Sequence, residues 1–177
     1  MRIFTAIDIE NQEALEKLEK VQGEVSYGFN KVKPEKMHLT LQFFQNINQE
    51  EVEKIKKGLK QAKLESFKMK VKGVGVFPSR KHVRVVWAGI ESEKIFDLKE
   101  QVSNHSVPDS NDHEFHPHIT LARVNGIDRT EKKYFRQKLE KLENREITEI
   151  NVNKIKLFES IHNGKNTEYR VIEEEKL

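Results

Sequence analysis

Two short segments of the chain carry the same pattern of residue types, and that pattern can perform chemistry. The segments are HLTL at 38–41 and HITL at 118–121. In a strand, side chains alternate between faces, and residues two apart lie roughly 6 to 7 Å from each other on one face. Each segment should therefore present an imidazole beside a hydroxyl, while the aliphatic residues face a core. Composition, with 7 His in 177 residues, predicts fewer than one His-x-Thr triplet, so two copies indicate a shared role.

Two such strands facing one another would bring together His38, Thr40, His118 and Thr120. Near neutral pH one imidazole can accept a proton from water while the other, protonated, donates to a departing oxygen. The hydroxyls can donate hydrogen bonds to non-bridging phosphate oxygens, whose charge grows as phosphorus is attacked. These groups suit the hydrolysis of a phosphodiester with no metal or other cofactor. A strained five-membered cyclic phosphate is the most natural target.

The composition places limits on the kind of protein. There is no Cys, which excludes disulfides and thiolate chemistry and fits a reducing compartment. The start of the chain lacks the features of a signal peptide, and no stretch approaches the roughly 20 apolar residues of a membrane span. We therefore expect a cytoplasmic protein without membrane contact. The net charge of +3 does not by itself indicate nucleic acid, although 67–84 carries six cations and no acid, an edge that a polyanion would favour.

The elements that must position the motifs follow from periodicity and turn residues. We expect strands at 2–8, 38–44, 67–71, 83–87, 118–121, 147–158 and 169–172. We expect helices at 14–25, 52–62, 95–102 and 135–142, the second behind a capping box of Asn48 and Glu51 and the fourth capped by Thr130. The polar stretch 104–117 reads as a loop that delivers the second motif.

The order of these elements predicts an α+β fold with largely antiparallel sheet and helices outside. No linker divides residues 1–177, so they should form one domain. The repeat of a His-x-Thr strand with helix and hairpin suggests a duplication into two pseudo-symmetric lobes. The site would then lie in a central cleft between the lobes.

The chain resembles the two-histidine phosphoesterases, and most closely the bacterial and archaeal RNA 2′,3′-cyclic phosphodiesterases within them. The resemblance covers nearly the whole chain, in order, through RIFTAIDI, VKPEKMHLTL, GVGVFPSRKHVRVVWAGI, FHPHITLARV and KLFES, with a later Gly164 and Tyr169. It implies a bilobal fold, no metal, and hydrolysis of a 2′,3′-cyclic phosphate at an RNA end to a 2′-phosphate.

By the same resemblance, His38 is the proton donor to the 3′ oxygen and His118 the acceptor of a proton from water. Thr40 and Thr120 bind the phosphate. The chain departs from the family where Lys-Phe-Leu-Gly commonly follows the first motif, because it has QFFQ at 42–45. The loss of that lysine at Gln42 is expected to weaken phosphate contacts.

Other side chains are candidates for substrate binding. Arg123 follows the second motif and could neutralise a phosphate, although strict strand alternation places it on the opposite face. Trp87 and Phe115 could stack on a base, although a lone Trp on an alternating strand is more often part of a core. Arg84 and Arg80 are candidate contacts to an RNA backbone.

Three alternatives remain open at this point. The chain could be a nucleotide or RNA-end binding module with little turnover, or it could act on 2′,5′-linked oligonucleotides, including by ligation. It could also be a zinc hydrolase, because His113, His116 and His118, with Asp112 and Glu114 among them, have a spacing that could ligate zinc. Pro117 interrupts that geometry. We expect a monomer whose partners are RNA ends or nucleotides.

Overall fold

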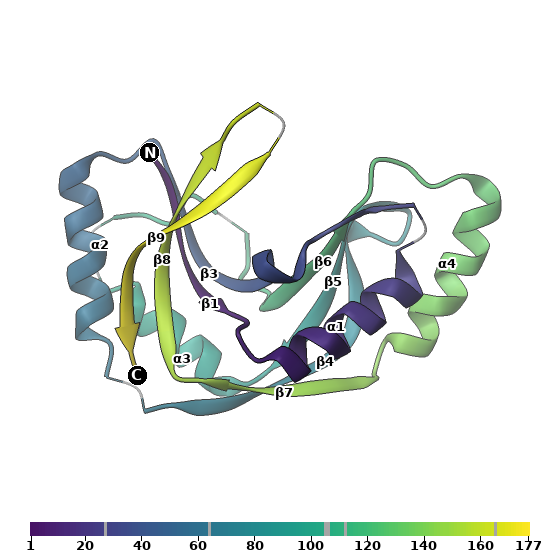
Figure 1. The fold of residues 1–177 in the computed structure, drawn as a ribbon, viewed down its shortest axis with the longest axis horizontal. Coiled ribbons are helices and arrows are strands. Elements are labelled where there is room, and N and C mark those ends of the chain that lie inside the picture. The colour runs from purple at the N-terminus through teal and green to yellow at the C-terminus, as the bar shows by residue number, and fades with distance from the viewer. Residues whose placement is uncertain (27, 64, 105–106, 112, 165) are drawn as a thin grey trace.

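The computed structural model describes residues 1–26, 28–63, 65–104, 107–111, 113–164 and 166–177 (Figure 1). The helices are α1 (Gln12–Val25), α2 (Gln49–Gln61), α3 (Glu93–Val102) and α4 (Arg129–Leu142), and a short 3-10 turn spans Pro34–Lys36. The strands are β1 (Arg2–Asp8), β2 (Asn30–Lys31), β3 (His38–Gln45), β4 (Phe67–Ser79), β5 (His82–Glu91), β6 (His118–Arg123), β7 (Glu146–Val152), β8 (Lys154–His162) and β9 (Thr167–Lys176).

These strands form one antiparallel sheet in the order β7-β4-β5-β6-β3-β1-β8-β9, with β2 beside β6. The fold is therefore α+β with antiparallel pairing, as predicted. The sheet has two four-stranded halves that meet where β3 pairs with β6, at Leu39 and Ile119. The two motif strands are thus the innermost strand of each half.

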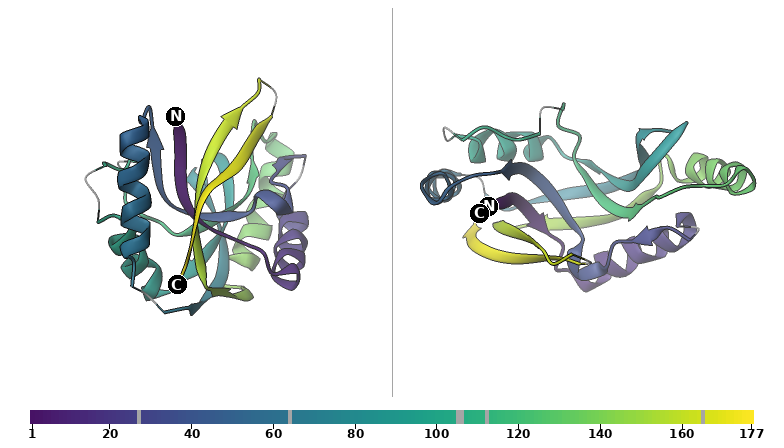
Figure 2. Two further views of the ribbon diagram at one scale, coloured as in Figure 1. Left: turned by 60° about the vertical axis from the view of Figure 1, so that its left-hand side comes forward. Right: turned by 90° about the horizontal axis from the view of Figure 1, so that it is seen from above.

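The two halves of the sheet are not the two halves of the chain. β1 and β3 pair with the late strands β8 and β9, whereas β4, β5 and β7 complete the half that contains β6. The single strand expected at 147–158 is in fact two strands that part at Asn153: β7 pairs with β4, and β8 pairs with β1. The helices form two groups: α1 and α4 contact each other and the half that contains β6, whereas α2 contacts α3 and β9. α3 also contacts β4, so it bridges the two halves. α2 and α4 lie at opposite ends of the molecule (Figures 1 and 2).

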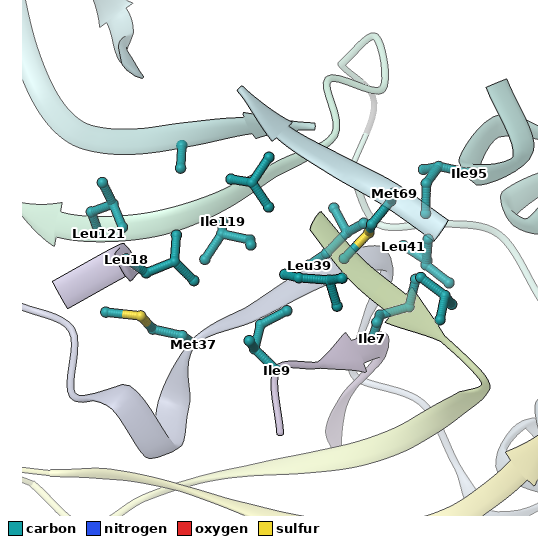
Figure 3. Packing of buried hydrophobic residues seen from close by; sticks show 14 of the residues in the cluster. Ile7, Ile9, Leu18, Met37, Leu39, Leu41, Met69, Ile95, Ile119 and Leu121 are labelled. Atoms are coloured by element: carbon teal, nitrogen blue, oxygen red, sulfur yellow. The ribbon is translucent and has the colours of Figure 1, made fainter. Parts of the chain in front are cut away.

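The aliphatic residues of both motifs form the centre of the core. Leu39, Leu41, Ile119 and Leu121 are at most 2% exposed and belong to one buried cluster. Figure 3 shows them packed with Leu18 of α1 and Ile95 of α3, so both helix groups meet this cluster. Burying a Leu or Ile side chain contributes about 1.5 to 3 kcal/mol. The motif strands are therefore held firmly from the face opposite their polar residues.

Local sequence signals explain where the helices begin. Asn48 and Glu51 form the predicted capping box at α2. At α4 the prediction of Thr130 as cap is wrong, because Asp128 is the cap and accepts from the backbone N–H groups of Thr130 and Glu131. Asp is as good a cap as Thr, and Glu131 completes a second capping box. Within the described residues, no helix is long and apolar enough to cross a membrane.

Candidate active site

The two His-x-Thr motifs lie side by side at the middle of the sheet. Their central residues, Leu39 and Ile119, pair directly across antiparallel strands. This register places the His of each motif across from the Thr of the other, so the four polar side chains share one face. The four side chains, all half-buried, are those of His38, Thr40, His118 and Thr120.

Both imidazoles are anchored in the same way. Nδ1 of His38 lies 2.7 Å from the carbonyl oxygen of Lys36, and Nδ1 of His118 lies 2.6 Å from that of His116. A carbonyl can only accept, so Nδ1 carries the hydrogen in each ring. Nε2 of each neutral ring is consequently left as the acceptor. This arrangement fixes the tautomer and leaves one nitrogen of each ring free for a substrate.

The surroundings of His38 act on its charge in opposite directions. Burial lowers the pKa of His38, and this is the largest influence. The hydrogen bond to the Lys36 carbonyl and the carboxylate of Asp8 raise the pKa, whereas positive charge on His118 or Arg123 lowers it. The net direction is downward, so His38 is predominantly neutral near pH 7 in the free protein.

The second imidazole differs in one respect. Burial is also the main cause that lowers the pKa of His118, and the backbone hydrogen bond to His116 opposes it. Positive charge on His116 and Arg123 lowers the pKa further. Among the described residues, no acidic side chain raises the pKa of His118 as Asp8 raises that of His38. The two rings are chemically alike but electrostatically unequal.

Aromatic rings border each imidazole. The centroid of the Phe4 ring lies 5.0 Å from that of His38, and Tyr169 meets His38 edge-on at 5.4 Å. Phe77 meets His118 edge-on at 5.0 Å. These contacts account for much of the burial that lowers the two pKa values.

Arg123 is on the same face as the imidazoles, which strict alternation did not predict. β5 pairs Trp87 with Thr120 but Val86 with Ala122, so Leu121 is an extra residue in a β-bulge. Leu121 and Ala122 are both fully buried, and alternation resumes one residue late. The side chain of Arg123 consequently returns to the polar face, where its charge lowers the pKa of both histidines.

β3 has a matching bulge, which explains the position of Gln42. Thr5 pairs with Gln42 while Ala6 pairs with Thr40, so Leu41 is the extra residue. Gln42 is 4% exposed, and its partner Thr5 lies between two cleft-facing residues of β1 and points the other way. The amide therefore faces the core side of the sheet. Gln42, which stands where the resemblance expects a lysine, thus lies on the face opposite the imidazoles, although it also lines a cavity with Thr40 and His118.

A cavity of about 540 Å³ opens beside the motifs where β3 and β6 diverge. Thr40 and His118 line it, together with the predicted binding residues Arg84 and Phe115. The ring of Phe115 also receives the ammonium group of Lys99, 4.8 Å from its centroid. The site thus continues from the histidines into a space with both charged and aromatic walls.

Trp87 lies between this site and a second cavity of about 670 Å³, which it lines with Phe115 and His116. Its ring is half-buried and lies 5.2 Å from Phe77 and 6.2 Å from His118. Its indole N–H is buried without a hydrogen-bond partner among the described residues. Trp87 is therefore neither a plain core residue nor a free stacking platform, but a wall beside His118. Arg80, another lining residue, is paired with Glu143 at 2.7 Å.

The geometry does not support the zinc alternative. Across the part of the chain that the structure describes, no three His, Asp or Glu side chains converge as metal ligands would. His116 and His118 instead pack against aromatic rings, with their own centroids 6.5 Å apart. Asp112, one member of the proposed cluster, lies outside the described residues.

The charged group next to His38 was not predicted from the sequence. Asp8 pairs with His38 across β1 and β3, and its carboxylate accepts from the ammonium of Lys156 at 2.9 Å. Lys156 is 7% exposed and also donates to Glu10 at 2.5 Å. Burial alone would lower the pKa of Lys156, but the hydrogen bonds to Glu10 and Asp8 raise it to about 12. Asp8 lies on the polar face of a strand that neighbours a motif strand. This position was the feature of the sequence that could have identified it.

Comparison with known proteins agrees with this geometry. The family model described as LigT like Phosphoesterase matches residues 7–87 and 90–169. The chain is 28% identical to the RNA 2′,3′-cyclic phosphodiesterase of Methanocaldococcus jannaschii over 98% of this chain and 99% of that one. It is 32% identical to the protein of the same name from Aquifex aeolicus, over 81% of this chain and 79% of the relative.

Solved structures are similar over the full length. TT0787 of Thermus thermophilus superposes with a TM-score of 0.80 at 27% identity, covering 100% of this chain and 98% of that one. Escherichia coli LigT complexed with NADP+ has the same fold, with a TM-score of 0.77 at 20% identity over 99% and 97% of the two chains. Since the family model matches nearly the whole chain in two segments, this protein belongs to the LigT-like phosphoesterase family.

Proposed function

We propose that this protein hydrolyses the 2′,3′-cyclic phosphate at the end of an RNA, or of a nucleotide, to a 2′-phosphomonoester. The observation that carries the proposal is the pairing of two imidazoles and two hydroxyls on one face, around the Leu39–Ile119 pair. Relatives that match this chain along most of its length bear the name RNA 2′,3′-cyclic phosphodiesterase. Two independent lines of support thus favour the same chemistry: the placement of the polar residues on one face of the sheet, and the resemblance to the family.

In the proposed reaction a water molecule attacks phosphorus while Nε2 of His118 takes one of its protons. Protonated His38 donates its Nε2 proton to the 3′ oxygen as the bond from phosphorus to that oxygen breaks. The products are a 2′-phosphate and a free 3′ hydroxyl. After this step His118 is protonated and His38 is neutral. Proton exchange with solvent returns each histidine to its starting protonation state. No other reactant is needed.

The remaining polar groups stabilise charge on phosphorus. Thr40 and Thr120 donate hydrogen bonds to the non-bridging oxygens, and Arg123 adds a positive charge on the same face. The anionic substrate also favours the imidazolium form, which offsets the effect of burial on the pKa of His38. Asp8 acts on the same ring in the same direction.

Three further side chains are proposed to bind the nucleotide. Phe115 offers an aromatic surface to the base, Trp87 forms the wall of the site beside His118, and Arg84 lines the cavity next to Thr40, where it can meet a phosphate. We propose that the enzyme acts as a monomer, because each chain supplies both motifs. We place it in the cytoplasm, because a chain without Cys fits a reducing compartment.

The test is hydrolysis of nucleoside 2′,3′-cyclic phosphates with and without a chelator, with the product isomer identified by phosphorus NMR. We expect a 2′-phosphate and full activity in chelator. His38→Ala and His118→Ala should each lower kcat by about 10²- to 10⁴-fold, since each removes one proton transfer. Wild-type turnover in either variant would refute the mechanism. Nucleotide binding without hydrolysis would favour a binding module, and activity lost in chelator would favour a metal enzyme.

A further inference from the structure

The outer surface of α4 carries four cations that the proposed reaction does not use. They are Arg129, Lys132, Lys133 and Arg136, all exposed, and we call them the α4 basic face. Their spacing of three or four residues puts them on one side of the helix. Together with Gln137 they line a surface hollow of about 380 Å³. Phe135 and Leu139 point to the core from another side of the helix.

These cations lack partners, in contrast to those of a comparable helix. On α2, Lys54 is 2.8 Å from Glu50, Lys56 is 2.9 Å from Glu53, and Lys60 is 3.6 Å from Glu173. No side chain of the α4 basic face forms an ion pair with any residue that the structure describes. Asp128 and Glu131, the acids next to these cations in sequence, both take part in the capping box. The α4 cations therefore remain available to an external anion.

The arrangement costs the helix stability. Like charges three or four residues apart on a helix repel one another and destabilise it. Arg129 and Lys132 also lie in the first turn, where the helix dipole favours negative charge. A bound anion would relieve both effects. A solvated surface helix gains nothing from this placement, whereas a polyanion-binding surface does.

The α4 basic face also lies close along the chain to the reaction site. Arg123 ends β6 on the polar face, and six residues later the chain enters α4 at Arg129. Six residues cannot span more than about 20 Å. Figure 1 shows the connection running from β6 to α4, which lies at the end of the molecule away from α2. A single strand leaving the site past Arg123 can therefore reach α4 within a few nucleotides.

We propose that the α4 basic face binds the phosphate backbone of single-stranded RNA upstream of the cyclic phosphate. This inference rests on the proposed function for the identity of the polymer, because the strand whose end enters the site is itself the polyanion. It predicts that long RNA ends are better substrates than mononucleotides, through KM rather than kcat. The contacts are to phosphates, so they carry no base preference.

The test compares two substrates in one neutralised variant, Arg129→Gln/Lys132→Gln/Lys133→Gln/Arg136→Gln. The substrates are a nucleoside 2′,3′-cyclic phosphate and a single-stranded oligoribonucleotide of roughly 20 residues with the same end, long enough to cover the helix. We expect unchanged kcat and KM on the nucleotide, which also shows that the variant is folded. KM for the oligonucleotide should rise about tenfold or more at low salt, and the log–log salt dependence should lose roughly 3 units of slope.

The matched control is Lys54→Gln/Lys56→Gln/Lys57→Gln/Lys60→Gln on α2, which removes the same charge from the opposite end of the molecule. It should leave the oligonucleotide KM unchanged. Equal losses in both variants, or no loss in the α4 variant, would overturn the proposal. So would α4-dependent binding to anionic vesicles in place of RNA.

A binding measurement separates this proposal from the proposed function. Fluorescence anisotropy with a labelled single-stranded RNA reports on the α4 basic face whether or not the protein has turnover. If the wild type hydrolyses neither substrate yet binds RNA through α4, only the proposed function fails. If it hydrolyses the nucleotide and the α4 variant binds RNA as tightly as the wild type, only the α4 proposal fails.

Discussion

The two imidazoles differ at the scale of single residues in a way that bears on their roles. Both are held by a backbone carbonyl, and burial lowers the pKa of both. Within the part of the chain that the structure describes, a carboxylate raises the pKa of His38, that of Asp8, and none raises the pKa of His118. A general acid must be protonated before it acts, so Asp8 favours His38 as the donor and His118 as the acceptor. The resemblance assigns the same roles on unrelated grounds.

This asymmetry predicts opposite responses of the pH profile to two substitutions. Asp8→Asn removes a carboxylate that raises the pKa of His38, so the alkaline limb of kcat/KM should move to lower pH.

Arg123→Gln removes a cation that lowers the pKa of both histidines, so both limbs should move to higher pH, and kcat/KM should fall by about 10- to 100-fold with the lost phosphate contact. The pH dependence of kcat/KM for a nucleoside 2′,3′-cyclic phosphate measures both shifts. The apparent pKa values of the two limbs belong to the pair of histidines together.

Two variants serve as controls for these shifts. Glu10→Gln removes another carboxylate that binds Lys156 but does not influence His38, so it should leave the limbs in place. Arg84→Gln removes a cation that lines the cavity without acting on either imidazole, so it should raise KM alone. An alkaline limb unmoved by Asp8→Asn would contradict the role of Asp8.

At the scale of elements, paired bulges shape the site. In β3 and in β6 the residue after His-x-Thr is an extra one, so the next two side chains exchange faces. In β6 this brings Arg123 to the polar face. In β3 the equivalent residue is Phe43, which packs with the aromatic cluster around Phe4. The same kind of bulge thus places a charged residue, Arg123, on the β6 side of the site and an apolar residue, Phe43, on the β3 side.

The glycines of β4 and β5 give a second prediction at this scale. A Cβ on Gly75 would lie 2.2 Å from the ring of Trp87, so Gly75→Ala must displace that ring. We expect a loss of about 1 to 3 kcal/mol in the free energy of unfolding, typical of overpacking, and a lower kcat because Trp87 borders His118. Urea unfolding followed by the fluorescence of the single Trp measures the first effect and reports the displaced ring directly.

The comparison variant is Gly126→Ala, because a Cβ at Gly126 meets nothing within 4 Å. Its unfolding midpoint, fluorescence spectrum and kcat should match those of the wild type. If Gly75→Ala behaved in the same way, the position assigned to Trp87 would be wrong.

The elements also show what the sequence could and could not predict. Alternation in 38–41 and 118–121 predicted the shared polar face, because a strand's faces follow from local geometry alone. The bulge at Leu121 leaves no local trace in the sequence, so alternation alone could not decide which face carries Arg123. The break at Asn153 was missed because β7 and β8 have similar strand patterns, and only their distant partners, β4 and β1, distinguish them. The periodicity of a segment predicts which face of a strand each side chain occupies. Which strands pair with one another depends on the whole chain.

At the scale of the molecule, the site exists only where the two halves of the sheet meet. β3 and β6 belong to different halves: one half combines the early strands β1 and β3 with the late strands β8 and β9, whereas the other contains the consecutive strands β4 to β7. Separating the halves would therefore dismantle the site and the core cluster together. The two half-buried histidines at this junction also connect the protonation of the site to the stability of the fold.

The last prediction follows from that connection. Burial lowers the pKa of His38 and His118 in the folded protein, whereas the unfolded chain has ordinary values of about 6.5. Between the lowered and the ordinary values the unfolded chain binds more protons, so stability rises with pH there. The contribution is complete above about pH 6.5 and is lost as the pH falls toward the lowered values. His38→Gln/His118→Gln should therefore lose less free energy of unfolding between about pH 7 and pH 5 than the wild type does. Urea titrations at each pH measure this, with the exposed pair His82→Gln/His162→Gln as control. Equal losses in the wild type and the site variant would mean that the imidazoles are not buried at the junction as described.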